Sequence, residues 1–166
     1  MNAQDKKVTV SADGDRSISI SRTFEATRDL VFEAHTNCEL VKRWLLGPDG
    51  WSMPVCEIDL RVGGKYRYVW RHTTKGHEMK MDGVYKEIER PERIVASEKF
   101  DDPWYEGEAV STVTLTESDG KTYFQNVITY ESQEVRDSVL RSPMEEGVAM
   151  SYDRLEELLH GQAKSA

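Results

Sequence analysis

The sequence predicts an α+β fold in which one seven-stranded antiparallel sheet packs against two short helices and a long C-terminal helix. Three patterns support this prediction. Short segments of alternating apolar and polar residues recur between residues 55 and 130, as in strands joined by hairpins. Two capped helical segments precede them, and residues 143–160 carry apolar side chains at helical spacing. With 166 residues, the chain is expected to form a single domain over residues 16–160.

The first predicted strand covers residues 16–24. Ile18, Ile20 and Phe24 alternate with serines there, which indicates a strand with one buried face. Residues 1–15 are polar and are expected to form a disordered lead, while residues 161–166 are expected to form a short tail.

Two short helices are predicted next. Thr27 is suited to cap a helix over residues 28–35, and Asn37 to cap a second helix over residues 38–45. The Gly47-Pro48 pair then ends the second helix.

Six further strands are expected to form a meander, over residues 55–60, 65–71, 78–89, 93–100, 109–118 and 121–130. The Asp119-Gly120 pair predicts a two-residue type I′ turn between the last two, because both of its central residues need a positive φ. This turn fixes a register in which Leu115 meets Phe124 and Val113 meets Asn126.

One strand carries an unusually aromatic face. Tyr66, Tyr68 and Trp70 alternate with residues that are charged except for Val69. A register that pairs the three aromatic residues with Gly83, Met81 and Met79 in that order keeps charged side chains away from the stripe. The alternative register would place Glu78, Lys80 and Asp82 beside the aromatic rings. We therefore interpret the stripe as the wall of a pocket.

The last helix is strongly amphipathic, and Ser132 is expected to cap a shorter helix before it, over residues 133–140. Gly147 and Ser151 fall within the apolar sector of the last helix. Small residues there would suit a helix that roofs a cavity, and close packing of the helix on the sheet explains them equally well.

Composition excludes some classes of partner. The net charge of −8 disfavours nucleic acid and anionic membranes, and no segment is long and apolar enough to cross a bilayer. Cys38 and Cys56 form neither a CxxC pair nor a disulfide framework, so we expect a reducing, cytoplasmic setting. No nucleotide-binding or metal-binding motif is present, and no cofactor or metal is expected.

The order of elements resembles the helix-grip fold of the START-like, or SRPBCC, superfamily, which includes birch-pollen-allergen-like proteins. Five local segments are similar to the homologues of the activator of the heat-shock-protein-90 ATPase: Val62–Arg67, Gly83–Ile88, Pro91–Val95, Asp119–Thr122 and Gly147–Leu155. The resemblance implies a deep pocket between the sheet and the C-terminal helix. It does not imply one activity, because the superfamily includes ligand carriers, cyclases and toxin-neutralising proteins. Founding members of the family also use a separate domain with an asparagine- and tryptophan-rich motif, which these residues lack.

The residues predicted to line the ligand-binding cavity are Tyr66, Tyr68, Trp70, Met79, Met81, Glu98, Phe100, Ser111, Asn126, Gly147 and Ser151. Glu98 faces inward if the alternation through Ile94 and Ala96 continues, whereas a bulge would expose it. A buried Glu98 would have a raised pKa, which makes it the one candidate for a catalytic acid.

Two other groups of residues are expected at the surface. Trp44, Trp51 and Trp104 are expected at the mouth of the pocket or on a partner surface, which would suit a homodimer. The four histidines, His35, His72, His77 and His160, are expected to be solvated.

The leading functional hypothesis is therefore the binding, sequestration or transport of a small apolar or aromatic ligand in a central cavity. The alternative is a protein-interaction module, such as a chaperone accessory. A third hypothesis is a cyclase-like or hydrolase-like enzyme that uses Glu98 as a general acid.

Overall fold

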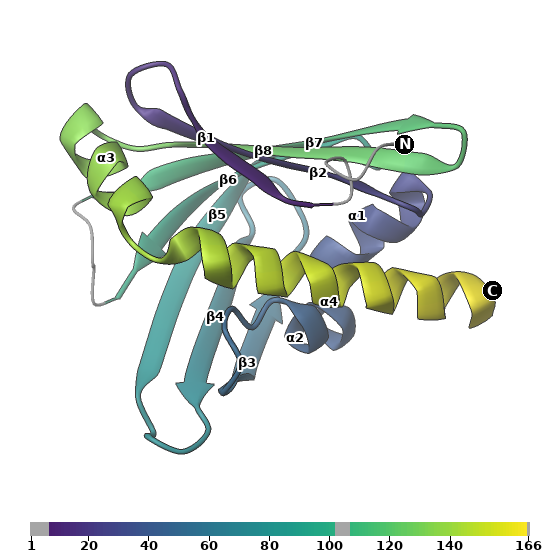
Figure 1. Ribbon diagram of the computed structural model, residues 1–166, viewed down its shortest axis with the longest axis horizontal. Helices are drawn as coiled ribbons and strands as arrows, with labels where there is room; N and C mark the ends of the chain where they lie inside the picture. Colours follow the sequence, from purple (N-terminus) through teal and green to yellow (C-terminus); the bar gives the residue numbers. More distant parts are fainter. Residues whose placement is uncertain (1–6, 102–106, 166) are drawn as a thin grey trace.

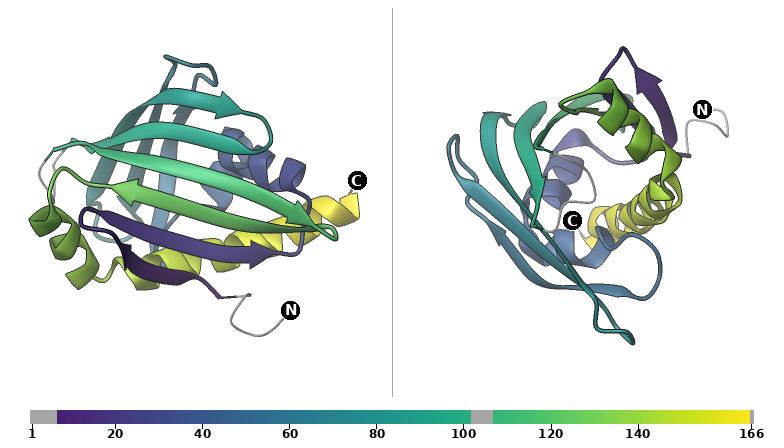
Figure 2. Two further views of the ribbon diagram at one scale, coloured as in Figure 1. Left: turned by 90° about the horizontal axis from the view of Figure 1, so that it is seen from above. Right: turned by 90° about the vertical axis from the view of Figure 1, so that its left-hand side faces the viewer.

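The computed structural model describes residues 7–101 and 107–165. Within them, one antiparallel sheet of eight strands curves around the helix α4 (Met144–Ser165), as Figures 1 and 2 show. The strand order is β1-β2-β8-β7-β6-β5-β4-β3, so the six strands from β3 to β8 form a continuous meander. The predicted α+β fold is confirmed, with one strand more than expected.

The strands are β1 (Thr9–Asp13), β2 (Ser17–Phe24), β3 (Trp51–Ile58), β4 (Lys65–His72), β5 (Glu78–Glu89), β6 (Arg93–Phe100), β7 (Ala109–Ser118) and β8 (Lys121–Thr129). The other helices are α1 (Arg28–Thr36), α2 (Cys38–Trp44) and α3 (Gln133–Arg141). Asn37 and Ser132 cap α2 and α3 as predicted, because their side-chain oxygens accept hydrogen bonds from the backbone N–H groups of Glu39 and Val135. Thr27 occupies the N-cap of α1 but makes no side-chain capping bond.

The two ends of the chain differ from expectation. β1 lies within the segment expected to be a disordered lead, and it pairs with β2 at the edge of the sheet. Its side chains are mostly exposed, so the sequence shows no apolar alternation there. At the other end, α4 continues to Ser165 and includes most of the expected tail. Among the described residues no helix, α4 included, is long and apolar enough to cross a membrane.

Both predicted registers are confirmed. Leu115 pairs with Phe124 and Val113 with Asn126, and the turn between β7 and β8 has positive φ values of 53° at Asp119 and 74° at Gly120. In the earlier hairpin, Tyr66, Tyr68 and Trp70 pair with Gly83, Met81 and Met79. The aromatic stripe therefore lies on one face of β4, beside the buried face of β5.

α4 is fixed against the sheet by aromatic packing and by polar contacts at its edges. The Tyr152 ring lies 5.0 Å from the Phe124 ring and 5.9 Å from the Phe24 ring, between centroids. Beside them, the guanidinium of the buried Arg22 donates a hydrogen bond of 2.7 Å to Asp153. These contacts set the height of α4 above the sheet.

A disulfide joins Cys38, at the start of α2, to Cys56 in β3. The two Cα atoms are 5.7 Å apart, a normal separation for a disulfide. The prediction that these cysteines remain unpaired is wrong, because α2 folds back onto the outer strand of the meander and the spacing in sequence carries no sign of that. The expectation of a reducing, cytoplasmic setting loses the argument on which it rested.

Replacing both cysteines with serine should lower the free energy of unfolding by about 2 to 3 kcal/mol, because the disulfide closes a loop between residues 18 apart in sequence. Urea unfolding under oxidising conditions measures the difference. With a thiol reductant present, the native protein and the double variant should have nearly the same free energy of unfolding. Equal unfolding midpoints under oxidising conditions would contradict the prediction.

Candidate functional site

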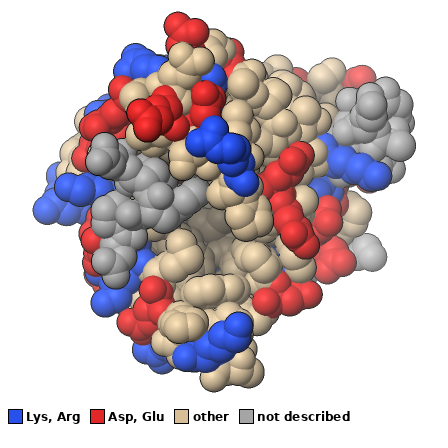
Figure 3. Space-filling model, turned by 60° about the vertical axis from the view of Figure 1, so that its left-hand side comes forward, with Lys and Arg blue, Asp and Glu red and all other residues tan. Residues whose placement is uncertain are grey.

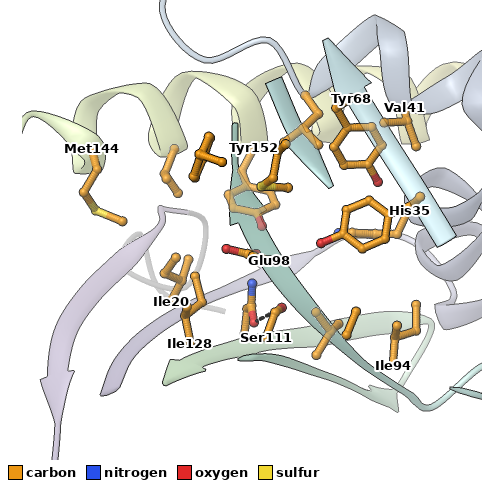
Figure 4. Close-up of a pocket in the computed structure, with 18 of the residues that line it drawn as sticks. Ile20, His35, Val41, Tyr68, Ile94, Glu98, Ser111, Ile128, Met144 and Tyr152 are labelled. Carbon is orange, nitrogen blue, oxygen red and sulfur yellow. Dashed lines mark hydrogen bonds between the residues drawn. The ribbon is translucent and has the colours of Figure 1, made fainter. Parts of the chain in front are cut away.

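A cavity of about 310 Å³ lies between the concave face of the sheet and the helices α1, α2, α3 and α4 (Figure 4). Its walls are mainly aromatic and aliphatic. The lining residues are Ile20, His35, Val41, Trp44, Leu45, Tyr66, Tyr68, Trp70, Met81, Tyr85, Ile94, Ala96, Glu98, Phe100, Ser111, Val113, Asn126, Ile128, Tyr130, Val139, Met144, Val148 and Tyr152. Figure 3 shows a hollow whose described border is made mainly of uncharged residues.

Most of the residues predicted for this cavity line it: Tyr66, Tyr68, Trp70, Met81, Glu98, Phe100, Ser111 and Asn126. They come from β4, β5, β6, β7 and β8, which are consecutive in the sheet. Glu98 faces inward and lines the cavity, so the alternative in which a bulge turns it to the solvent is wrong. The indole N–H of Trp70 also donates a hydrogen bond of 2.7 Å to the Leu45 carbonyl, which ties β4 to the end of α2.

Three predicted residues do not line the cavity. Met79 is 39% exposed, because it lies near the end of the β4–β5 hairpin, beyond the region that the helices cover. Gly147 lies against Pro48, at 3.1 Å from the position a Cβ would take. Ser151 accepts a hydrogen bond of 2.8 Å from the backbone N–H of Gly47. These two small residues allow the loop after α2 to approach α4 closely, so their role is in packing.

The tryptophans assigned to the surface also differ from expectation. Trp44 is buried and lines the cavity, because it lies on the inner face of α2 with Leu40 and Val41, and its indole N–H donates a hydrogen bond to the Ala34 carbonyl. Trp51 is half-buried, with its ring edge-on to His72 at 5.3 Å between centroids. Trp104 lies outside the described residues.

His35 lines the cavity, so the prediction that it is solvated is wrong. Its ring stacks on Phe124 at 5.3 Å between centroids and meets Trp44 edge-on at 4.9 Å. The Nδ1–H group donates a hydrogen bond of 2.7 Å to the Val31 carbonyl, which leaves Nε2 buried with no hydrogen-bond partner among the described residues. Burial lowers the pKa of His35 to about 4, against the smaller opposite effect of the Val31 bond, so the ring is neutral at pH 7.

Glu98 provides the one carboxyl group among the described residues that line the cavity. It projects from β6 and lies beside Tyr152 in Figure 4. Burial raises the pKa of Glu98 to about 7. Burial also raises the pKa values of the Tyr68 and Tyr152 hydroxyls, and the charge of Glu98 adds to both shifts, so these hydroxyls remain protonated hydrogen-bond donors.

A polar pair on β7 and β8 completes the wall. The Ser111 hydroxyl donates a hydrogen bond of 2.8 Å to the amide oxygen of Asn126 (Figure 4). That bond orients the amide and leaves its NH₂ group as a donor for a ligand. The cavity thus combines apolar walls with a few polar groups of fixed orientation, as small-molecule sites commonly do.

A second group of titratable side chains lies outside the cavity. Glu25, Glu156 and His160 bring one ligand atom each within 4.8 Å of one another. His160 and Glu156 are one turn apart on α4, with 3.6 Å between Nε2 and Oε2. Acidic groups commonly gather near a histidine without a metal, and we assign none here.

The sequence matches the protein family described as activator of Hsp90 ATPase homolog 1-like over residues 25–160. That range contains α1, α2, α3 and most of α4, together with every strand that lines the cavity except β2. The chain belongs to this family. Its membership agrees with the resemblance noted from the sequence and with the START-like fold.

Solved structures of bacterial proteins share the architecture. A protein from Rhodobacter sphaeroides is 27% identical, with a TM-score of 0.87, over 93% of this chain and 99% of its own. Protein NE0264 from Nitrosomonas europaea is 23% identical, with a TM-score of 0.80, over 93% of this chain and 100% of its own. An AHSA1-like protein from Aeromonas hydrophila is 19% identical, with a TM-score of 0.70, over 86% of this chain and 93% of its own. No curated protein matches the chain.

Proposed function

We propose that this member of the activator of Hsp90 ATPase homolog 1-like family binds a small, mainly apolar or aromatic molecule in its central cavity, to sequester or carry it. The observation that supports the proposal is the cavity of about 310 Å³, which has aromatic walls and few polar groups. Residual exposure of Trp70 and Phe100 is consistent with a site that is incompletely filled by the protein's own side chains.

Native mass spectrometry of freshly purified protein tests the proposal directly, because it detects a ligand that stays bound during purification. We expect an added mass that disappears when the protein is denatured. Absence of an added mass, together with no binding of apolar probes in solution, would count against a ligand-binding role.

Replacing Val148 with tryptophan should weaken binding of the neutral fluorescent probe N-phenyl-1-naphthylamine by about tenfold or more. Val148 projects from α4 into the cavity, so the larger ring takes the space of the ligand. Titration of probe fluorescence measures the change. Met150→Trp is the matched control, since Met150 is a half-buried residue of the same helix that does not line the cavity. Equal loss of binding in both variants would indicate a general disturbance of α4.

The alternative role, a protein-interaction module, is favoured by the family match alone. The tryptophans expected at the surface, which also suggested this role, give it less support because Trp44 is buried. A partner recovered from lysate by the native protein and equally by Val148→Trp would favour this alternative, because such a partner would not use the cavity.

A further inference from the structure

The charges around the cavity are unbalanced. Glu98 is the one acidic residue among the described residues that line it, and no Lys or Arg is among them. His35, the one histidine among the described lining residues, is neutral at pH 7 because burial lowers its pKa to about 4. An ionised Glu98 therefore has no cationic partner in the described wall.

The groups that face Glu98 can donate hydrogen bonds but cannot neutralise its charge. Tyr68 and Tyr152 both feel the charge of Glu98, and each offers a neutral hydroxyl. Arg22, which is buried in β2, does not line the cavity, and its guanidinium pairs with Asp153. A buried carboxylate without a cation is costly, and a ligand that supplies the cation removes that cost.

We propose that the ligand of the cavity is a small apolar or aromatic molecule that carries a protonated amine, and that Glu98 binds the amine. This inference rests on the ligand-binding role proposed above. A carboxylate ligand would meet like charge and find no cation. An ammonium group would instead pair with Glu98 beside the rings of Tyr68 and Tyr152, whose hydroxyls both feel the charge of Glu98, and aromatic rings attract cations. The remaining walls accommodate the apolar part of the ligand.

The proposal carries a pH dependence with a defined sign. The other titratable groups that line the cavity are His35, Tyr66, Tyr68, Tyr85, Tyr130 and Tyr152. Because Glu98 ionises with a pKa of about 7, the fraction that is carboxylate rises about thirtyfold between pH 5.5 and pH 8, while an alkylamine of pKa about 10 stays protonated. Affinity for an amine should rise by up to that factor, and affinity for a neutral analogue should not.

Isothermal titration calorimetry tests the proposal with three probes that share a naphthalene ring and differ in the polar group: 2-naphthylmethylamine, 2-naphthalenemethanol and 2-naphthoate. At pH 8 the native protein should bind the amine about tenfold or more tightly than the alcohol, and the carboxylate most weakly. Glu98→Gln should weaken amine binding by about tenfold to a hundredfold and change alcohol binding less than twofold. Glu89→Gln, which alters an exposed carboxylate of β5, should change neither.

The outcomes separate this inference from the proposed function. If the alcohol binds but the amine binds no more tightly, or if Glu98→Gln weakens both equally, the amine assignment is overturned and the cavity remains a ligand site. If no probe binds the native protein and no copurified mass is found, both proposals fall. The pH profile of the native protein gives an independent check, since amine affinity that is level from pH 5.5 to 8 would also overturn the assignment.

Discussion

Replacing Gly83 with alanine should destabilise the protein by about 4 kcal/mol, which is a large part of the stability of an ordinary domain. Gly83 lies opposite Tyr66 in the β4–β5 hairpin. A Cβ at this position would overlap the Tyr66 ring and the backbone carbonyl oxygen of Ser97. Neither can move easily, because the Tyr66 hydroxyl donates a hydrogen bond of 2.6 Å to that same carbonyl. Urea unfolding followed by circular dichroism measures the loss.

Gly161→Ala is the matched control. Gly161 lies in α4, and nothing stands within 4 Å of the position its Cβ would take. Alanine there should stabilise the protein by about 0.5 to 1 kcal/mol, because alanine favours helix more than glycine does. If Gly83→Ala unfolds at the same urea concentration as the native protein, the prediction is wrong, and the aromatic stripe tolerates a shift away from β5.

The Gly83–Tyr66 pair shows what could be predicted from the sequence. The register of this hairpin follows from burial alone, since the other register would bury Glu78, Lys80 and Asp82. The β7–β8 register follows from the chemistry of the Asp119-Gly120 turn. Once strands are in register, the alternation of side chains decides which of them face inward. Most of the cavity residues on the sheet can therefore be predicted from the sequence.

What the helices contribute was harder to predict. Val31, Phe32 and His35 share a face of α1, so the spacing that signals burial was present in the sequence, but a histidine at a helix end is usually solvated. A helical wheel of α4 groups Gly147 and Ser151 with the apolar residues, and both are on the buried face. A helical wheel does not show which neighbouring element each residue contacts. Contacts between elements distant in sequence, such as the Cys38–Cys56 disulfide, leave no local pattern to read.

Removing either His35 or Glu98, which both line the cavity, should make the stability of the two variants respond to acid in opposite directions. In Glu98→Gln, His35 remains neutral in the folded protein while its pKa returns to 6.5 on unfolding, so the unfolded chain binds the extra proton and stability falls with pH below 6.5. In His35→Phe, Glu98 with its pKa of about 7 holds a proton that the unfolded chain releases down to pH 4.5, so stability rises as the pH falls. Each change amounts to about 1 to 2 kcal/mol between pH 6.5 and pH 5.

The two variants should therefore diverge by about 3 kcal/mol over that window, while the native protein stays nearly level because the two effects cancel. Urea unfolding of the three proteins at pH 5, 5.75 and 6.5 measures the divergence, and the window lies above the range in which exposed carboxylates titrate. The double variant is the internal control and should be as level as the native protein. Parallel profiles for the two single variants would mean that both groups are solvated through the cavity, and the electrostatic basis for an amine ligand would weaken with them.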